Sequence, residues 1–320
     1  MTDGEPVRWG ILSTAGINRK LLAGARQSDR LEIAAVASRS LERAAAYAKE
    51  HAIPRAYGSY EELLADPEIE AVYVPLPNAL HHPWTLNALH AGKHVLCEKP
   101  YSRRPADVAD AFDEAERRGL VVSEAFMWRH NPQTGRLLEL LPEIGQLQTV
   151  RATFSFNLTQ PENVRLQADL DGGALMDVGC YCVSGARLLA GKEPERVYGE
   201  QVLGESGVDV RFTGLLRFPS GVVAELTSAF TTQHMSLEAI GTAGSIALAD
   251  PWHCYEPVLR LNGRELRSEL RNSYQLELEN VSAAIRGEAK PLLGREDTLG
   301  QARTIEALYR SAETGAPVTL

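Results

Sequence analysis

Short apolar runs alternate with helical patterns through the first 124 residues, and this alternation restricts the chain to few folds. Buried apolar runs are typical of parallel sheets, and strands that alternate with helices indicate βαβ units. We therefore expect an α/β domain of the Rossmann type, built on a doubly wound parallel sheet of six strands. The strands that can be placed cover residues 7–12, 31–37, 71–74, 95–97 and 120–123. The helices cover residues 17–27, 41–50, 60–65, 81–91 and 105–118.

The pattern changes after Glu124, where a helix at 133–141 precedes a region dominated by alternating strands. Strands are expected at residues 148–157, 211–218, 222–231, 237–240 and 245–248, and helices at 174–190, 273–287 and 296–315. Because 320 residues exceed the usual size of one core, we predict two domains. Residues 1–124 would bind a dinucleotide. Residues 125–320 would form an α+β substrate-binding and oligomerisation domain with a large, mostly antiparallel open sheet, and the C-terminal helix could pack back on the first domain.

One face of the second sheet would take the helices, and the other could join two copies of the chain. Phe212, Val223 and Phe230 are candidates for that outer face. We therefore expect a homodimer or homotetramer through the C-terminal sheet, with ordinary one-sided alternation as the alternative.

The overall charge and the cysteines limit the remaining classes. A formal net charge of −9 argues against binding to nucleic acid or to an anionic membrane. No apolar run approaches the ~20 residues of a membrane span, and the first residues do not form a signal peptide. The four cysteines contain one Cys-x-Cys pair and no second cluster, so we expect free thiols, no structural metal and a cytoplasmic protein.

The turn after the first strand is a candidate pyrophosphate site. Ser13, Thr14, Ala15 and Ile17 lie between that strand and a helix, where small residues let the backbone approach a phosphate. The expected G-x-G-x-x-G is replaced by Ser13-x-Ala15-x-x-Asn18. By itself this motif would also suit any strand-to-helix turn.

Two further stretches fit a dinucleotide. Ser38 and Arg39 end the second strand, with Arg43 one helical turn later, and a hydroxyl with guanidinium groups suits a 2′-phosphate. NADP is therefore favoured over NAD, with a solvated arginine as the alternative. After the strand at 71–74, the candidate cofactor contacts are Pro75, Leu76, Asn78 and His81. Adjacent helical histidines point about 100° apart, which is a poor geometry for a shared metal.

Glu98-Lys99-Pro100 follows the strand at 95–97 without a spacer, where open α/β sheets bind their ligands. Taken alone, the pair could be a surface ion pair at a strand end. The surrounding Gly-Lys-His-Val-Leu-Cys-Glu-Lys-Pro is more specific, because it resembles a signature of the Gfo/Idh/MocA family of NAD(P)-dependent oxidoreductases. Other segments carry the same resemblance: residues 9–17, 35–40, 72–78 and 171–181. Residues 127–129 and 163–166 resemble the branch of NADP-linked xylose dehydrogenases and dimeric dihydrodiol dehydrogenases.

The resemblance implies catalytic roles for Lys99, Asp177 and Tyr181. Many family members carry histidine at the end of the motif that here ends in Tyr181. Asp177 and Tyr181 are four residues apart and hence on one helix face, which suits a shared ligand but also a buried hydrogen-bonded pair. The reaction implied is hydride transfer between NADP and a hydroxyl-bearing carbon of a sugar or cyclic polyol.

In this mechanism Tyr181 is the acid/base and Lys99 lowers its pKa, or Lys99 itself accepts the proton. Asp177 would orient the substrate or Lys99, and Glu98 would contact the nicotinamide-side ribose or offset the lysine charge. Substrate contacts would come from Trp128 and Phe154 as apolar walls and from Arg165. Two rival functions stay open: a non-catalytic NADP-binding sensor, and a glycosidase or eliminase with tightly bound NAD.

Overall fold

The computed structural model describes residues 4–320, which form two compact units. The first unit takes in the chain up to Ser102, Ala106–Met127 and Asn272–Thr298. The second takes in Arg103–Pro105, Trp128–Arg271 and Leu299–Leu320. The domain limits expected from the sequence stay a prediction.

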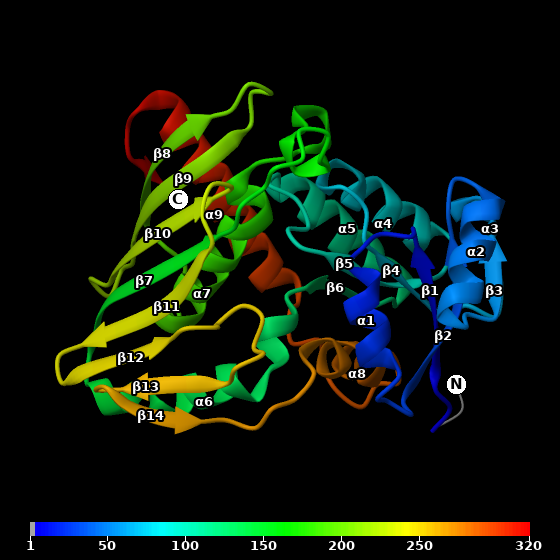
Figure 1. Ribbon diagram of the computed structural model, residues 1–320, viewed down its shortest axis with the longest axis horizontal. Coiled ribbons are helices and arrows are strands. Elements are labelled where there is room, and N and C mark those ends of the chain that lie inside the picture. Colours follow the sequence, from blue (N-terminus) through cyan, green and yellow to red (C-terminus); the bar gives the residue numbers. More distant parts are fainter. Residues whose placement is uncertain (1–3) are drawn as a thin grey trace. The chain divides into compact units, whose positions relative to one another are not determined.

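The first unit is built on a six-stranded parallel sheet with the order β3-β2-β1-β4-β5-β6 (Figure 1). Its strands are β1 (Val7–Leu12), β2 (Leu31–Ala37), β3 (Arg55–Tyr57), β4 (Ala71–Val74), β5 (His94–Glu98) and β6 (Val122–Ala125). Its helices are α1 (Asn18–Ala25), α2 (Leu41–His51), α3 (Tyr60–Leu64), α4 (His81–His90), α5 (Pro105–Arg118) and α8 (Ser273–Ile285). The predicted Rossmann-type sheet is confirmed.

The strand order places the switch point of this sheet at β1, which pairs with β2 on one side and β4 on the other. Trp9 and Ile11 of β1 are fully buried, as expected for a central strand covered on both faces. Helix α8 covers this strand from far along the sequence, and Trp9 Nε1 donates to Ser282 Oγ over 3.1 Å. The turn after β1 and the loop after β4 therefore lie next to each other at the carboxyl edge.

Two details of the first sheet differ from expectation. The last strand begins at Val122 instead of 120, because Gly119 and Leu120 close helix α5. Gly119 has a φ of 66°, and Leu120 N–H donates back to Ala115 O over 2.9 Å, as in a helix C-cap. Strand β3 is the one of the six that was not placed from the sequence. It has only three residues, all half-buried, and so carries no apolar run that would reveal it.

The second unit contains a nine-stranded sheet with the order β14-β13-β12-β11-β7-β10-β9-β8-β15, antiparallel except for the β7–β10 pair. Its first strands are β7 (Leu147–Ser155), β8 (Arg196–Leu203), β9 (Asp209–Arg217), β10 (Val223–Ala229) and β11 (His234–Gly241). The others are β12 (Gly244–Leu248), β13 (Val258–Leu261), β14 (Arg264–Arg267) and β15 (Val318–Thr319). Its helices are α6 (Pro132–Leu140), α7 (Cys180–Ala190) and most of α9 (Arg295–Thr314). The predicted large, mostly antiparallel sheet is confirmed.

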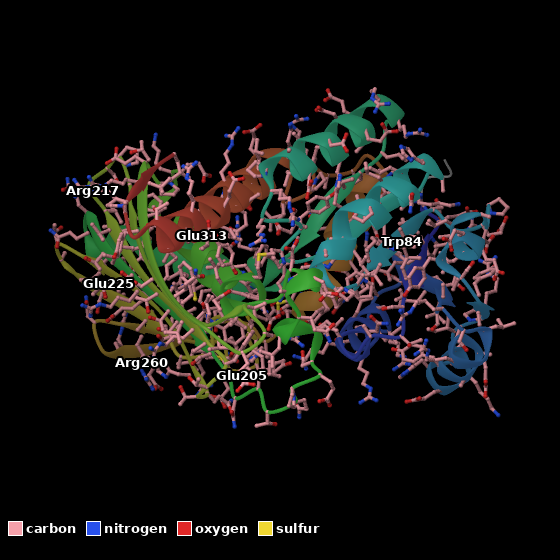
Figure 2. The ribbon with its side chains drawn as sticks, turned by 90° about the horizontal axis from the view of Figure 1, so that it is seen from above. Trp84, Glu205, Arg217, Glu225, Arg260 and Glu313 are labelled. Carbon is pink, nitrogen blue, oxygen red and sulfur yellow. The ribbon has the colours of Figure 1, made fainter. Side chains whose placement is uncertain are left out.

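Helices cover one face of this second sheet. In Figure 2 the side chains of Arg217, Glu225 and Arg260 project from the other face, while α9, which carries Glu313, covers the first. Phe212 lies on the covered face, 2% exposed, with its ring edge-on to Tyr309 of α9 at 5.7 Å.

The placement of Phe212 on the outer face is therefore wrong. Phe230 is likewise buried, packed against Phe156 at 5.3 Å, so it does not belong to an outer apolar surface. Val223 is half-buried at the start of β10. Among the described residues, no helix is long and apolar enough to cross a membrane.

Candidate functional site

The turn after β1 is held by side chains where glycine was expected. Ser13 has a φ of 138°, a region that favours glycine. Its Oγ accepts from Ala15 N–H (3.2 Å) and donates to Pro75 O (3.3 Å), which joins the two loops at the switch point. Asn18 Nδ2 donates to Ser13 O over 2.8 Å. Hydrogen bonds of Ser13 and Asn18 thus stabilise a turn that lacks the usual glycines.

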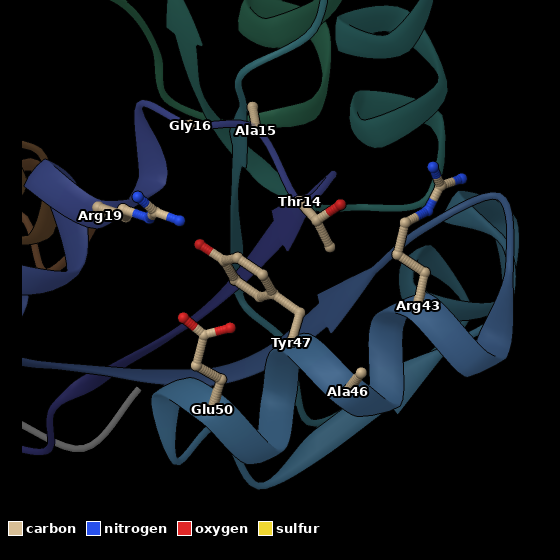
Figure 3. A pocket seen from close by; sticks show the side chains of 8 residues that line it. All are labelled: Thr14, Ala15, Gly16, Arg19, Arg43, Ala46, Tyr47 and Glu50. Atoms are coloured by element: carbon tan, nitrogen blue, oxygen red, sulfur yellow. The ribbon is translucent and has the colours of Figure 1, made fainter.

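A pocket of about 260 Å³ opens at this turn (Figure 3). It is lined by Thr14, Ala15, Gly16, Arg19, Arg43, Ala46, Tyr47 and Glu50. Helix α1 begins beside it, and the first turn of that helix carries Arg19 and Lys20 but no acidic residue. Cations at a helix N-terminus oppose the helix dipole, and a bound anion would offset both charges. The pocket therefore fits a phosphate-bearing ligand such as the pyrophosphate of a dinucleotide.

Arg19, Tyr47 and Glu50 were missed by reasoning from the sequence. Figure 3 shows the Arg19 guanidinium and the Tyr47 hydroxyl facing each other across the pocket, with Glu50 beside them. Burial raises the pKa of Tyr47, so its hydroxyl stays a neutral hydrogen-bond donor. The signal for Arg19 was its position on the first turn of α1. Tyr47 and Glu50 lie in the C-terminal half of α2, where nothing in the local sequence pattern distinguishes them.

Ser38 and Arg43 lie together at the end of β2, as predicted for a 2′-phosphate site. Arg43 Nε donates to Ser38 Oγ over 3.0 Å, and Ser38 is buried. The Ser40 hydroxyl caps α2 by accepting from Arg43 N–H. Arg39 is exposed between them. A hydroxyl and two guanidinium groups thus gather within six residues, which suits a dianionic phosphate.

His81 is buried and bridges the two loops that follow β4 and β5. Its Nδ1 lies 2.8 Å from Pro100 O and its Nε2 lies 2.7 Å from Leu76 O. Only the charged imidazolium could donate to both carbonyls, but burial lowers the pKa of His81 to about 4. We favour the neutral ring, which donates to one carbonyl at a time. His81 therefore positions Leu76 and Pro100, and its direct contact with a cofactor stays a prediction.

Glu98 and Lys99 are half-buried at the end of β5, and the Lys99–Pro100 peptide bond is cis. The Tyr73 hydroxyl donates to Glu98 Oε1, and Glu98 Oε2 accepts from Lys99 N–H at 3.2 Å. Glu277 of α8 is buried, and desolvation together with the charge of Glu98 raises its pKa well above the ordinary value. Burial also raises the pKa of Tyr73. Tyr73 and Glu277 therefore stay protonated beside Glu98.

Asp177 lies in the second unit on η6 (Leu175–Gly179), a π-helical turn that leads into α7. The predicted regular helix at 174–190 is therefore wrong in its first turn. Asp177 Oδ2 accepts from Arg165 Nε over 2.6 Å, and the Arg165 guanidinium lies 5.9 Å from the centre of the Phe156 ring. Arg165 thus contacts the predicted catalytic acid directly, a relationship that the sequence did not reveal.

Tyr181 is surrounded by aromatic rings of its own unit. Phe154 packs edge-on against it at 5.3 Å, and Trp252 lies at 6.0 Å. Trp252 was missed, although it is fully buried and donates from Nε1 to Thr153 O over 2.9 Å. Trp128 contacts Trp252 at 5.2 Å and is itself buried behind it.

His253 extends this aromatic group, because its ring lies 5.5 Å from Phe154. An apolar wall beside Tyr181 is the surface on which the face of a sugar ring would stack. Cys180 and Cys182 are buried on the same helix, and burial raises the pKa of Cys182, so neither is a candidate nucleophile.

The structure thus brings together several predicted residues within each unit. In the first, Ser13 meets Pro75, Ser38 meets Arg43, and His81 meets Leu76. In the second, Asp177 meets Arg165 and Tyr181 meets Phe154. Joint action of Lys99 with Asp177 and Tyr181 stays a prediction. No group of three residues among those described could hold a metal ion.

Comparison with known proteins gives matches over both halves. The Gfo/Idh/MocA model described as an oxidoreductase family with an NAD-binding Rossmann fold matches residues 7–126, and the Gfo/Idh/MocA C-terminal domain model matches residues 142–247. D-xylose 1-dehydrogenase (NADP(+)) 2 of Haloferax volcanii is 42% identical over 323 residues, covering 98% of this chain and 99% of that protein.

Two further matches are similar in sequence or structure. Trans-1,2-dihydrobenzene-1,2-diol dehydrogenase of Bos taurus is 38% identical over 257 residues, covering 78% of this chain and 76% of that protein. The crystal structure of an aldose-aldose oxidoreductase from Caulobacter crescentus, complexed with glycerol, has a TM-score of 0.91 at 28% identity. It covers 98% of this chain and 100% of that one.

Proposed function

The chain belongs to the Gfo/Idh/MocA family of oxidoreductases, and on that basis we propose that it is an NADP-dependent dehydrogenase of sugars or cyclic polyols. The family resemblance seen in the sequence is confirmed. Relatives named for D-xylose and a dihydrodiol, and a structural match that binds glycerol, share a carbon that bears a hydroxyl group. That shared chemistry defines the substrate class proposed for this chain.

The observation that carries the choice of NADP is the contact between Arg43 and Ser38. Together with Arg39 they offer charge-assisted hydrogen bonds to a 2′-phosphate, and positions 38 and 39 at the strand end hold serine and arginine instead of the acidic residue that would bind the ribose hydroxyls of NAD. Arg19 and the N-terminus of α1 would hold the pyrophosphate. When bound, NADP supplies the acceptor for the hydride.

The chain's own residues would handle the proton. Tyr181 would take the hydroxyl proton while hydride leaves the carbon that bears this hydroxyl, and Lys99 would favour the charged phenolate and donate to the reacting oxygen. In the second assignment Lys99 is the acceptor. Asp177, fixed by Arg165, orients a substrate hydroxyl, and Glu98 contacts the nicotinamide-side ribose or offsets the charge of Lys99. Phe154 and the rings behind it would exclude water from one side of the substrate.

We also propose that two copies associate through the outer face of the second sheet. Arg151 lies between Glu225 and Glu238 on neighbouring strands, with ion pairs of 3.2 and 3.7 Å, so this face carries alternating charges that a second copy could complement. Sedimentation of the native chain and of Arg151→Glu tests this, since a monomeric native chain would exclude it. The four cysteines are buried thiols outside any disulfide, which supports a cytoplasmic location.

The central experiment measures NADPH formation with a panel of aldoses, inositols and dihydrodiols. Lys99→Ala should abolish turnover while NADPH binding, followed by fluorescence, is retained; full activity would refute the role of Lys99. Tyr181→Phe should cost about 10²–10⁴-fold in kcat if the tyrosine is the acid/base, and far less if Lys99 accepts the proton. Cofactor released on denaturing the purified protein would instead favour the glycosidase or eliminase. A chain that binds NADPH but turns over no substrate would be the sensor.

A further inference from the structure

The segment that carries Asp177 begins with a tight backbone arrangement. Gly173, with a φ of 128°, donates from its N–H to Arg165 O and accepts from Asp177 N–H, both over 2.9 Å. The π-helical turn η6 follows directly. Single π-helical turns next to α-helices occur often at functional sites, and they persist only where surrounding contacts hold them. The contact that holds this turn therefore bears on where Asp177 points.

That contact comes from Asp209, the first residue of β9. Asp209 is 2% exposed, and its Oδ2 accepts from Leu175 N–H over 2.7 Å, at the first residue of η6. Its Oδ1 accepts from the Tyr309 hydroxyl of α9 over 2.8 Å. A Cβ on residue 173 would lie 2.2 Å from Oδ1, so the glycine is what lets the carboxylate reach the start of the turn.

The cost of burying this carboxylate argues for a specific role. Desolvation raises the pKa of Asp209 to about 6, although Leu175 N–H and the Tyr309 hydroxyl both favour the charged form. The Tyr309 ring is contacted on its face by Arg103, whose guanidinium carbon lies 5.2 Å from the ring centre. An apolar residue would pack in the same place without a desolvation cost. It would leave the N–H of Leu175 without an acceptor, two residues before Asp177.

We propose that Asp209 is a positioning residue for the reaction, which fixes the first turn of η6 and thereby the direction of the Asp177 carboxylate. This inference rests on the proposed role of Asp177. Asp209 touches neither substrate nor cofactor in this assignment; it acts through Leu175 N–H and, with Tyr309, determines the register of the π-helical turn. Arg165 then holds the Asp177 side chain from the other side.

Two substitutions of Asp209 separate this role from simple packing. Asp209→Leu keeps the number and branching of the side-chain heavy atoms, with methyl groups bulkier than the carboxylate oxygens, and removes both acceptors. Asp209→Asn can keep its oxygen on Leu175 N–H and turn its amide toward the Tyr309 oxygen, which can accept as well as donate. Ser311→Ala is the matched control, because Ser311 is buried on α9 and bonds Gly199 N–H and Ala316 O, away from η6.

We expect Asp209→Leu to lower kcat about tenfold or more with unchanged NADPH affinity, because displaced catalytic groups lose their alignment. Asp209→Asn should restore most of the rate, and Ser311→Ala should leave kcat and KM per folded molecule unchanged. Amide hydrogen exchange in residues 173–181 should quicken in Asp209→Leu alone. Native kcat in a folded Asp209→Leu, or exchange that Ser311→Ala quickens equally, would overturn the proposal.

The exchange measurement does not depend on knowing the substrate. If the native chain oxidises no polyol, the proposed function fails, and exchange at 173–181 still decides whether Asp209 holds the turn. If Asp209→Leu fails to fold, Tyr309→Phe takes its place, because it removes one of the two hydrogen bonds and keeps the ring. Unchanged exchange and unchanged kcat in Tyr309→Phe would then count against the proposal.

Discussion

Arg43 donates a hydrogen bond of 3.0 Å from Nε to the buried hydroxyl of Ser38, which fixes the guanidinium at the end of β2. Since only NADP has a phosphate to place there, Arg43→Ala should raise KM for NADP about tenfold or more and leave KM for NAD nearly unchanged. Steady-state kinetics with both cofactors measure this. Arg19→Ala is the comparison, because loss of a pyrophosphate contact should weaken both cofactors alike. If Arg43→Ala raised KM for NADP and KM for NAD equally, the assignment of Arg43 to the 2′-phosphate would be contradicted.

The pair of Arg165 and Asp177 predicts a loss of rate from a residue outside the catalytic set. Arg165→Met should lower kcat about tenfold, because the carboxylate of Asp177 loses the hydrogen bond that orients it. Arg165→Lys keeps the charge but not the planar donor, so its kcat should lie between that of the native chain and that of Arg165→Met. If Arg165→Met raised only the KM for the sugar, Arg165 would be a substrate contact instead.

His81 predicts a dependence of stability on pH. The unfolded chain binds a proton at its ordinary pKa of 6.5, whereas the folded protein does so only near pH 4, so stability falls as pH falls through this window. Between about pH 7.5 and pH 5 the native chain should lose about 2 kcal/mol at this site. His94 and His130, whose pKa values are also lowered by burial, add to the loss.

Urea unfolding of the native chain and of His81→Gln at both pH values isolates the contribution of His81. The variant should be less stable at neutral pH, since a carbonyl contact is lost, but its stability should change less on acidification. His234→Gln, a substitution at an exposed position of β11, is the control. A native chain as stable at pH 5 as at pH 7.5 would exclude this linkage.

Trp252 and its neighbour His253 predict different effects: substitution of Trp252 should lower stability, and substitution of His253 should weaken substrate binding. Its ring is fully buried against Phe154, Tyr181 and Trp128. Trp252→Ala should lower the free energy of unfolding by about 3–5 kcal/mol through the cavity that remains. His253→Ala, at the half-buried edge of the same group, should raise KM for the sugar and change stability little. Denaturant unfolding and kinetics of both variants test this division.

The sequence predicted the parts of the fold that local chemistry determines. β1 and β2 begin and end as expected because their apolar runs are bounded by polar residues, and α5 begins at Pro105 and ends at Arg118 as expected. The π-helical turn could not be read in this way. It depends on Asp209 and Tyr309, which lie far along the chain from Asp177, and no apolar period distinguishes it from an ordinary helical turn.

The prediction that Phe212 lies on the outer face of the second sheet was wrong for a similar reason. Alternation along β9 shows that successive residues face opposite sides, but which side receives α9 is determined by a helix almost a hundred residues later. The cofactor residues were more accessible, since strand ends and helix starts lie at fixed places in a doubly wound sheet. The contact between Arg165 and Asp177 could not be predicted, because Arg165 lies on an irregular segment whose position no periodic pattern reveals.

The bond between Trp9 of β1 and Ser282 of α8 has a consequence for how this protein is made. The central strand β1 of the first unit emerges early from the ribosome. The helix that covers it, α8, is the second-to-last α-helix to emerge. The first unit therefore cannot be completed during synthesis before residue 298 has emerged. A fragment that stops at Met127 would expose the side of β1 that α8 covers, and we expect it to aggregate instead of binding NADP.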